Sequence, residues 1–434
     1  MEMDAHMMKR SLFIVILLGS FNLFSSIYAM QWSSPAYIPG SAGAIHAAVA
    51  MDASGNALVA WQVSTANNPV IRIAYYTATG QSWSSVKELG SAYNKSNVYV
   101  SMSASGTGII AWIDGQQVVQ TVAYAQQDWV TWQPVLVRHS LLGDQATAFY
   151  IPQNFSSTTY LAWTSSSGVY GASYRALGDV WSEPKLLMNG PCYSTTCAVD
   201  TLGNGVFEWI AQSGTSTFKV CAALYDATQS FDTWVPVIQI LSQTAYACSL
   251  SVGICSLNNQ VGTAIFAWID TKGLQATLYN SATAWQSWSP AAAQKLLGSS
   301  VLFSAQATMD TLGNILFAMQ LLNNYCQQTF YSATQLWNDW KPENSIIVKD
   351  KTIVNDIVLT PSQIGLIMLT SLERYRLNTV YVASTDPATT PVAINRTCIP
   401  SSQKMLALQQ GSDPVAAMAL WPSMPADGIC YIVA

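Results

Sequence analysis

The stretch DASGNALVAW, residues 52–61, joins a short Asp-Gly-Asn segment to an apolar run that ends in tryptophan. The segment recurs as DTLGN at residues 200–204 and 310–314. Asp at the first position and Gly at the fourth are typical of a type I turn, because the Asp side chain accepts hydrogen bonds from nearby backbone amides. A calcium loop needs several oxygen ligands, and one Asp per copy does not supply them. The pattern therefore predicts a turn between two strands.

Tryptophan recurs in two series that share one period. The first series is Trp32, Trp83, Trp132, Trp181, Trp234, Trp288 and Trp340, at steps of 49 to 54 residues. The second is Trp61, Trp112, Trp163, Trp209, Trp268, then Met319, Leu369 and Trp421, at steps of 46 to 59 residues. A tryptophan that recurs at the same place in every repeat is typical of a core position, not of a ligand platform.

Each repeat has the pattern of four short strands. Residues 45–90 contain four apolar or alternating runs separated by turn residues. Four strands in each of several repeats of this length predict an all-β fold, a β-propeller in which each repeat forms one blade. A series of β-sandwiches is the structural alternative.

The number of repeats predicts how the propeller closes. Eight copies are present, but the chain ends after the third strand of the eighth, and WSSPAYI at residues 32–38 is an unattached outer strand. Pairing the two completes eight four-stranded blades and removes two exposed sheet edges. Seven blades is the alternative, since the seventh copy lacks both the tryptophan and the DxxGN turn.

The motif WxxP followed by DxxGNxxxxW resembles the repeat of exported bacterial β-propellers and, more distantly, sialidase-type and propeller-lectin folds. The resemblance covers nearly the whole chain after residue 29 and implies the fold. The sialidase Asp box, SxDxGxxW, places Trp three residues after Gly, whereas Trp61 lies six residues after Gly55. The sialidase signature therefore does not transfer, and no residue matches a lectin motif.

The amino terminus predicts an export signal over residues 1–29. Lys9 and Arg10 precede an apolar run at residues 12–24, and Ala29 ends the segment. We expect a single propeller domain over residues 30–434 that is periplasmic, cell-surface or extracellular, with no stable membrane insertion after cleavage. Only 9% of residues are charged and the net charge is −5, so nucleic acid is not an expected partner.

The 8 cysteines permit disulfide bonds in an exported chain. Cys192 with Cys197, and Cys248 with Cys255, are close enough in sequence for local bridges, although spacing does not fix connectivity. Free buried thiols are the alternative for Cys221 and Cys326. The chain has no CxxC pair and only two histidines after residue 29, so we expect no metal and no cofactor.

No GxSxG, HExxH, P-loop or Rossmann glycine motif is present. We therefore expect a secreted non-catalytic recognition module that binds a glycan or a protein surface, with a glycoside-active enzyme of the sialidase-like propeller type as the alternative. Binding is expected on the polar loops after the second strand of each repeat. The candidate ligand-binding residues are Asn67, Asn68, Asp114, Gln116, Asp270, Lys272, Asn323, Asn324, Arg374, Tyr375 and Arg376.

One position breaks the repeat. The residue before the tryptophan of the second series is Ala60, Ala111, Ala162, Ala267 and Ala318, but in the fourth repeat it is Glu208. A carboxylate among packed strands must be paired or must have a raised pKa. Glu208 is therefore a candidate buried functional carboxylate, with an ion pair to Lys219 or Arg175 as the structural alternative.

Overall fold

The computed structural model describes the chain from residue 36 to residue 433, with gaps. The gaps are residues 64–68, 94–97, 125–138, 142–145, 153, 179, 215–216, 245–246, 258–259, 280–292, 299–301, 311, 322–325, 340–344, 349–351, 360–363, 372–375, 385–391, 394–404, 409–416 and 423–428. Residues 1–35, which include the predicted signal peptide, and residue 434 also lie outside the described residues.

The described strands pair into eight sheets, which we number along the chain. The first sheet contains β2 (Ala44–Met51), β3 (Ala57–Val63), β4 (Val70–Thr77), β5 (Ser82–Trp83) and β6 (Lys87–Ser91). The second contains β7 (Val98–Ser103), β8 (Gly108–Ile113), β9 (Val119–Tyr124) and β10 (His139–Leu141). The third contains β11 (Ala146–Tyr150), β13 (Thr158–Ser165), β14 (Gly168–Arg175), β15 (Val180–Trp181) and β16 (Lys185–Asn189). The fourth contains β17 (Cys192–Val199), β18 (Gly205–Gln212), β19 (Phe218–Tyr225) and β20 (Gln239–Thr244).

The second half of the chain repeats this order. The fifth sheet contains β21 (Ala247–Leu257), β22 (Gln260–Asp270), β23 (Gly273–Tyr279) and β24 (Gln294–Gly298). The sixth contains β25 (Leu302–Met309), β26 (Ile315–Leu321), β27 (Cys326–Tyr331) and β28 (Ser345–Val348), with the short helix η3 (Trp337–Asp339) before β28. The seventh contains β29 (Thr352–Leu359), β30 (Ile364–Ser371), β31 (Arg376–Ser384) and β32 (Val392–Ala393). The eighth contains β33 (Met405–Leu408), β34 (Ala417–Pro422), β35 (Ile429–Val433) and β1 (Ala36–Tyr37).

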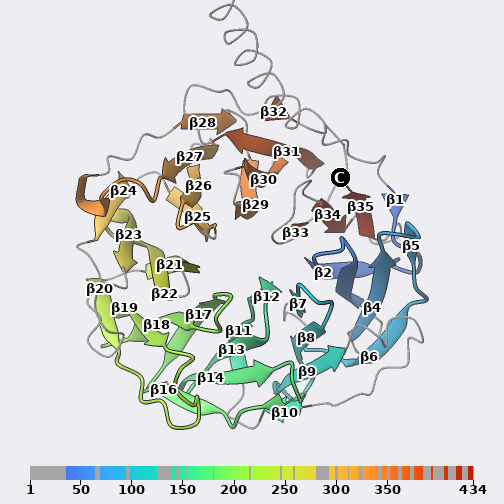
Figure 1. The fold of residues 1–434 in the computed structure, drawn as a ribbon, viewed down its shortest axis with the longest axis horizontal. Helices are drawn as coiled ribbons and strands as arrows, with labels where there is room; N and C mark the ends of the chain where they lie inside the picture. Colours follow the sequence, from blue (N-terminus) through green and yellow to red (C-terminus); the bar gives the residue numbers. More distant parts are fainter. Residues whose placement is uncertain are drawn as a thin grey trace, which may run out of the picture.

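The sheets stand around a ring, with the first strand of each sheet nearest the centre (Figure 1). The first strands of neighbouring sheets contact one another, as β2 does with β7 and β17 does with β21. At the edge of the eighth sheet, β1 pairs antiparallel with β35, with Ala36 opposite Tyr431 and Tyr37 opposite Cys430. The first described strand of the chain and the last therefore lie in one sheet.

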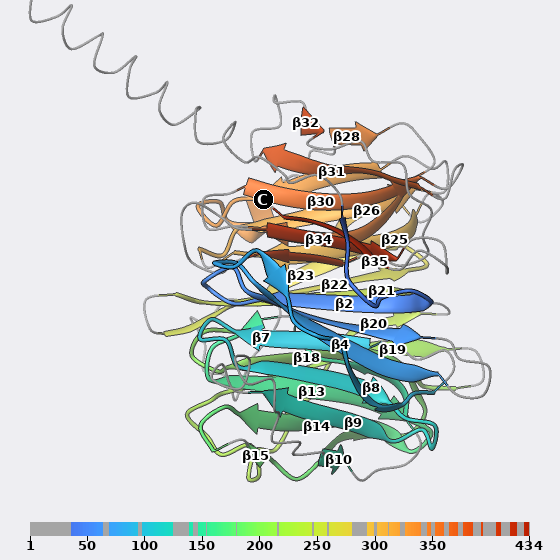
Figure 2. The same cartoon turned by 90° about the vertical axis from the view of Figure 1, so that its right-hand side faces the viewer.

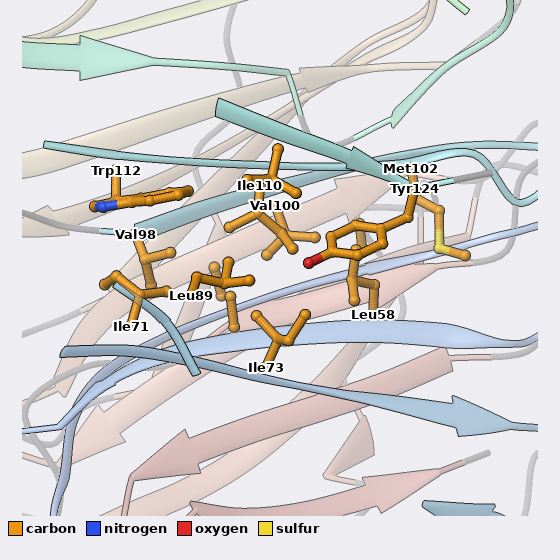
Figure 3. Close-up of a cluster of buried hydrophobic side chains, with 14 of the residues drawn as sticks. Leu58, Ile71, Ile73, Leu89, Val98, Val100, Met102, Ile110, Trp112 and Tyr124 are labelled. Atoms are coloured by element: carbon orange, nitrogen blue, oxygen red, sulfur yellow. The ribbon is translucent and has the colours of Figure 1, made fainter. Parts of the chain in front are cut away.

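The sheets pack face to face through side chains that alternate along each second strand. In β3, Leu58 and Ala60 join a buried cluster shared with the second sheet, whereas Val59 and Trp61 join a different cluster on the opposite side. Figure 3 shows the first of these clusters, in which Leu58 and Ile73 of the first sheet lie beside side chains of the second sheet. Because both faces of β3 are buried, its sequence is apolar except at Gln62, whose side-chain amide donates to Tyr93 O at 3.1 Å.

Five tryptophans of the second series are core residues, as predicted; the side chain of the sixth, Trp421, lies outside the described residues. Their side chains are at most 2% exposed, and each belongs to a buried cluster; they are Trp61, Trp112, Trp163, Trp209 and Trp268. Burial of each large apolar side chain stabilises the fold by on the order of 2–3 kcal/mol. The repeat is therefore a packing repeat.

A second aromatic contact recurs where the third strand of a sheet ends. A tyrosine at that position meets a tryptophan with ring centroids 5.2 Å apart in four sheets, in the pairs Tyr76–Trp83, Tyr174–Trp181, Tyr225–Trp234 and Tyr331–Trp337. Spacing alone assigned the place in the sixth repeat to Trp340, which lies outside the described residues. Among the described residues, the turn of η3 brings Trp337 to the tyrosine.

The third sheet departs from the repeat. After β11 the chain forms β12 (Asn154–Phe155), which pairs parallel with β7 of the second sheet. This strand stands where other repeats have a DxxGN turn, and it ties the second sheet to the third.

The predicted local disulfide between Cys192 and Cys197 is wrong. Both residues lie in β17, where a separation of five residues corresponds to about 16 Å of extended chain, well beyond the reach of a disulfide. Cys192, Cys197 and Cys221 are free and buried. Burial raises the pKa of the Cys192 thiol to about 11, so the thiol stays protonated at neutral pH. Cys248 and Cys255 likewise share one strand, β21.

Candidate functional site

The ring has two faces that differ in chemistry. In an antiparallel meander the first and third connections lie at one end of the sheet, and the second connection lies at the other end with the link to the next sheet. Figure 2 shows the strands running from one face of the ring to the other. We use the name turn face for the first connections at one end, which are residues 52–56, 103–107, 200–204, 310 and 312–314; the third connections at the same end are not included in the name. We call the other end the loop face, made of residues 92–93, 114–118, 165–168, 190–193, 212–214, 217–218, 244, 247 and 270–273.

Backbone hydrogen bonds between sheets support this division. On the turn face, Ala53 N donates to Ala104 O of the next sheet at 3.1 Å. On the loop face, Tyr93 N donates to Ile113 O at 2.8 Å, which joins the link after the first sheet to the second sheet. Corresponding connections of the first and second sheets are therefore hydrogen-bonded to each other on the same face of the ring.

The turn face consists of near-identical turns. In the fourth sheet, Gly203 N donates to Asp200 O at 3.1 Å, and the Asp200 carboxylate accepts from Leu202 N and Asn204 N at 2.9 and 2.8 Å. The Asn204 side-chain amide donates to the second carboxylate oxygen at 2.9 Å. The side-chain carbonyl of Asn204 accepts from Ala227 N at 3.0 Å, and this bond fixes the connection after the third strand. Each polar atom of the motif thus has a place in the turn.

The copies at Asp52 and Asp310 repeat these contacts at 2.8 to 3.1 Å. The glycine of each copy has a positive φ, between 79° and 88°, which explains why the fourth position is glycine. In the second sheet Ser103 replaces the aspartate, and its hydroxyl accepts from Thr107 N at 2.9 Å. The prediction of a turn is confirmed.

The aspartates of the turn face are partly desolvated. Burial raises the pKa of the Asp200 and Asp310 carboxyls, and the hydrogen bonds from the turn amides and from Asn204 and Asn314 offset part of the rise. The Asp200 and Asp310 carboxylates therefore serve to accept hydrogen bonds from the backbone amides of their own turns.

On the loop face, Asp114 holds a turn of the same kind. Its carboxylate accepts from Gln116 N and Val118 N at 2.9 and 3.0 Å and from the Gln120 side chain at 2.9 Å. Gln117 stands where the other turns have glycine, and its φ is 64°. The Gln116 side chain is exposed. Ligand binding by Asp114 and Gln116 stays a prediction, with Gln116 the more available of the two.

Both carboxylate oxygens of Asp270 also accept hydrogen bonds from nearby protein groups. One carboxylate oxygen accepts from Lys272 N at 2.7 Å, and the other accepts from the Ser242 hydroxyl and the Trp268 indole at 2.8 and 3.1 Å. Lys272 itself is exposed beside it. In this loop Lys272 is therefore the residue that a ligand can reach.

The other sequence candidates are not placed as side chains. Asn67, Asn68, Asn323, Asn324, Arg374 and Tyr375 lie outside the described residues, and Arg376 is placed only by its backbone, as the first residue of β31.

A group on the loop face escaped the sequence analysis. Tyr193 lies at the loop-face end of β17 with its side chain 52% exposed. Its hydroxyl donates to the Gln212 side-chain carbonyl, and its ring meets that of Phe218 at 5.8 Å with an interplanar angle of 71°. The segment CYSTTC gave no signal, because an exposed aromatic in a strand cannot be told from a buried one by residue type.

Glu208 lies in the middle of β18, between the fourth and fifth sheets. Its side chain is 0% exposed, and neither carboxyl oxygen makes a hydrogen bond within the described residues. Burial raises the pKa of Glu208 well above its usual value, and the nearby Ser251 backbone N–H of the fifth sheet offsets part of the rise. The raised pKa favours the protonated, neutral form of the buried Glu208 carboxyl.

The ion pair of Glu208 with Lys219 or Arg175, the structural alternative, is absent from the described residues. There, the one ion pair joins Arg72 to Glu88 at 3.4 Å across the outer strands of the first sheet. The described part of the chain contains no group of three side chains suited to hold a metal ion. Nor does it contain a helix with the length and apolar character to cross a membrane.

No protein-family model and no curated protein sequence matches this chain. Solved structures do match its fold. The Dos1 propeller aligns with a TM-score of 0.56 at 11% identity, over 94% of this chain and 96% of that one. The likeness is confined to fold: this chain has the all-β architecture of a β-propeller.

Two further matches have lower scores. The BP39L lectin from Burkholderia pseudomallei has a TM-score of 0.48 at 10% identity, over 82% of this chain and 100% of that one. The polysaccharide lyase Uly1 also has a TM-score of 0.48 at 10% identity, over 92% and 93% of the two chains. Neither similarity bears on function.

Proposed function

We propose that this protein is an exported eight-bladed β-propeller, completed by the pairing of β1 with β35, and that it is a non-catalytic recognition module that binds a glycan through its loop face. The observation that carries the proposal is the contrast between the two faces. On the turn face the polar groups of the repeat bond to one another. The loop face presents exposed Gln116, Lys272 and Tyr193, which differ from sheet to sheet.

The chemistry of the loop face favours a glycan. Its described exposed groups are amides, hydroxyls and an aromatic ring, with few charges. A sugar offers hydroxyls for hydrogen bonds at its rim and C–H groups for contact with a ring face. A small number of polar groups around an aromatic surface is the usual composition of a small-molecule site.

The carboxylates of this region argue for binding without catalysis. Glycoside hydrolysis uses two carboxyl groups that flank the scissile bond and are free to transfer a proton or attack carbon. Asp114 and Asp270 already accept hydrogen bonds on both oxygens. Glu208 is enclosed between sheets and out of reach of substrate.

A glycan array probed with the protein after removal of residues 1–29 tests this function. We expect binding to a restricted set of glycans, and no release of reducing sugar from a panel of glycosides. A pull-down that recovers a partner protein while the array stays blank would favour the protein-ligand alternative. Hydrolysis that is lost on substitution of a carboxylate pair would establish the enzyme alternative instead.

Closure of the ring has its own test. Deletion of residues 30–39 removes β1, so β35 loses its edge partner and the eighth sheet gains an open edge. We expect a loss of several kcal/mol in the free energy of unfolding and faster proteolysis near Trp421. Unchanged protection of that region would contradict an eighth blade shared by the two ends of the chain.

Export is tested by N-terminal sequencing of the protein recovered outside the cytoplasm. The proposal predicts a chain that begins at Met30. An intact residue 1 on the recovered protein would contradict cleavage after Ala29.

A further inference from the structure

We propose that Tyr193, Gln212 and Phe218 form a preorganised subsite for one pyranose ring of a neutral oligosaccharide, on the loop face of the fourth sheet. This inference rests on the proposed glycan-binding function and assigns it to named residues. It follows from the strand register, from the contacts that fix the tyrosine, and from the polarity of the groups around it.

The register of β17 explains why the ring of Tyr193 is exposed. Cys192 lies opposite Ala211 and Ser194 lies opposite Ile210, so Tyr193 has no residue opposite it in β18. This is a β-bulge, and bulges redirect a side chain away from the regular alternation of a strand. Cys192 is buried on one side of the bulge, whereas Tyr193 is 52% exposed.

The same bulge occurs on the first strand of other sheets. In the third sheet the shift falls between Ala146 and Ala148, so the bulged residue is Thr147. Its hydroxyl lies 3.1 Å from the Thr164 hydroxyl and 3.3 Å from the Thr164 carbonyl, so it is used within its own sheet. At the equivalent place in the fourth sheet an aromatic ring projects instead.

Two contacts fix the ring in the free protein. The Tyr193 hydroxyl donates to the Gln212 carbonyl oxygen, and the amide nitrogen of Gln212 donates to Gly214 O at 2.8 Å. Phe218 supports the ring from the third strand, at 5.8 Å between centroids. A tyrosine has two side-chain torsions, so fixing it in advance lowers the entropy lost when a ligand binds.

The link before β17 is fixed backbone that adds no side chain at Gly190. Gly190 has a φ of 99°, and nothing lies within 4 Å of the position that a Cβ would take there. The link is anchored on both sides, because Gly190 N donates to Ser167 O at 2.8 Å and Gln212 N donates to Pro191 O at 2.9 Å. Tyr193 therefore projects from a strand end whose preceding backbone is held in place.

The polarity of the group selects a neutral sugar. Tyr193 and Phe218 supply apolar ring surface, and Gln212 has one amide N–H that the described contacts do not use. The next exposed residues, Ser213 and Thr217, carry hydroxyls that lie 3.0 Å from each other. An apolar ligand would leave the remaining Gln212 amide N–H unpaired, whereas a pyranose can meet the ring with its C–H face and the amide with a hydroxyl.

Titration of neutral oligosaccharides of four to six hexose units against wild type and variants tests the subsite. We expect Tyr193→Ala to weaken binding about tenfold or more, which corresponds to about 1.4 kcal/mol. Tyr193→Phe keeps the ring and should weaken binding only a few-fold. Leu312→Ser, an exposed position on the turn face, is the control and should bind as wild type does. Equal thermal unfolding of all four proteins shows that the fold is intact.

The outcomes separate the subsite from the general function. If wild type binds an oligosaccharide and Tyr193→Ala binds it equally well, the subsite is overturned and the loop-face function stands. If wild type binds none of the probes while it captures a partner protein, both the subsite and the glycan function are overturned. A Tyr193→Phe variant as weak as Tyr193→Ala would overturn the stacking role of the ring.

Discussion

The turn face and the loop face lie at opposite ends of the same strands. The residues of the turn face recur from sheet to sheet, whereas those of the loop face differ. On the turn face, Asp, Gly and Asn recur with hydrogen-bond lengths that agree between copies. On the loop face, the fourth sheet has Tyr193 and Gln212, and the fifth has Asp270 and Lys272. Residues whose side chains hydrogen-bond to the backbone of their own turn tolerate little substitution. Exposed loop residues whose side chains are not needed for the fold can differ in sequence and bind a ligand.

The largest effect expected from this contrast is on stability at the turn face. Asp200→Ala removes three hydrogen bonds to the carboxylate and leaves Leu202 N and Asn204 N without that acceptor. We expect the free energy of unfolding to fall by about 2–3 kcal/mol, with glycan binding unchanged. Denaturant unfolding measures the first quantity and titration of oligosaccharide measures the second.

Leu202→Ser is the matched control, since Leu202 is exposed in the same turn. It should change stability by less than about 0.5 kcal/mol. If Asp200→Ala were equally mild, the turn would not depend on its carboxylate.

Glu208 lies midway between the two faces, and its effect should appear in the pH dependence of stability. Because the pKa of Glu208 is raised in the folded protein, the folded state holds its proton more tightly than the unfolded state. Its stabilising contribution is therefore complete below the ordinary glutamate pKa and is lost as pH rises toward the folded-state pKa. Glu208→Gln keeps the shape and removes the titration, so we expect its free energy of unfolding to fall less than that of wild type as the pH rises from 4 to 8.

Glu208→Ala, which installs the residue of the sister sheets, should lose the same pH dependence. Denaturant unfolding at both pH values provides the comparison. A wild type and a Glu208→Gln variant with parallel pH profiles would show that the carboxyl does not titrate in the folded protein above the unfolded value.

The smallest effects concern the backbone of the two kinds of turn. Gln117 on the loop face has a φ of 64°, whereas Gly203 occupies the same place on the turn face with a φ of 88°. We expect Gln117→Gly to raise the free energy of unfolding by up to about 1 kcal/mol and Gly203→Ala to lower it by about 1–2 kcal/mol. Thermal unfolding of both variants checks the pair, and a shift of the same sign in both would contradict a shared turn geometry.

The sequence predicts what repeats. The period of tryptophan predicted the buried positions Trp61 and Trp209. The DxxGN turns were predictable because glycine and aspartate have specific backbone roles. These signals are local, and repetition makes each one stronger.

What does not repeat escaped prediction. The exposed ring of Tyr193 depends on a bulge that is set by strand register, and no residue type marks it. The choice of Trp337 over Trp340 depends on one turn of helix in a connection. The free thiol of Cys192 depends on its sharing a strand with Cys197, which spacing alone could not show. Each depends on backbone geometry that residue type and spacing do not mark.

Amide hydrogen exchange with and without bound glycan tests the central claim, that the loop face is the binding face, most directly. The protein is measured alone and with a saturating amount of the tightest oligosaccharide from the array. The account predicts slower exchange in residues 190–194 and 212–219, with no change in residues 52–56, 200–204 and 310–314. Slower exchange in the turn-face segments, with the loop-face segments unchanged, would contradict it.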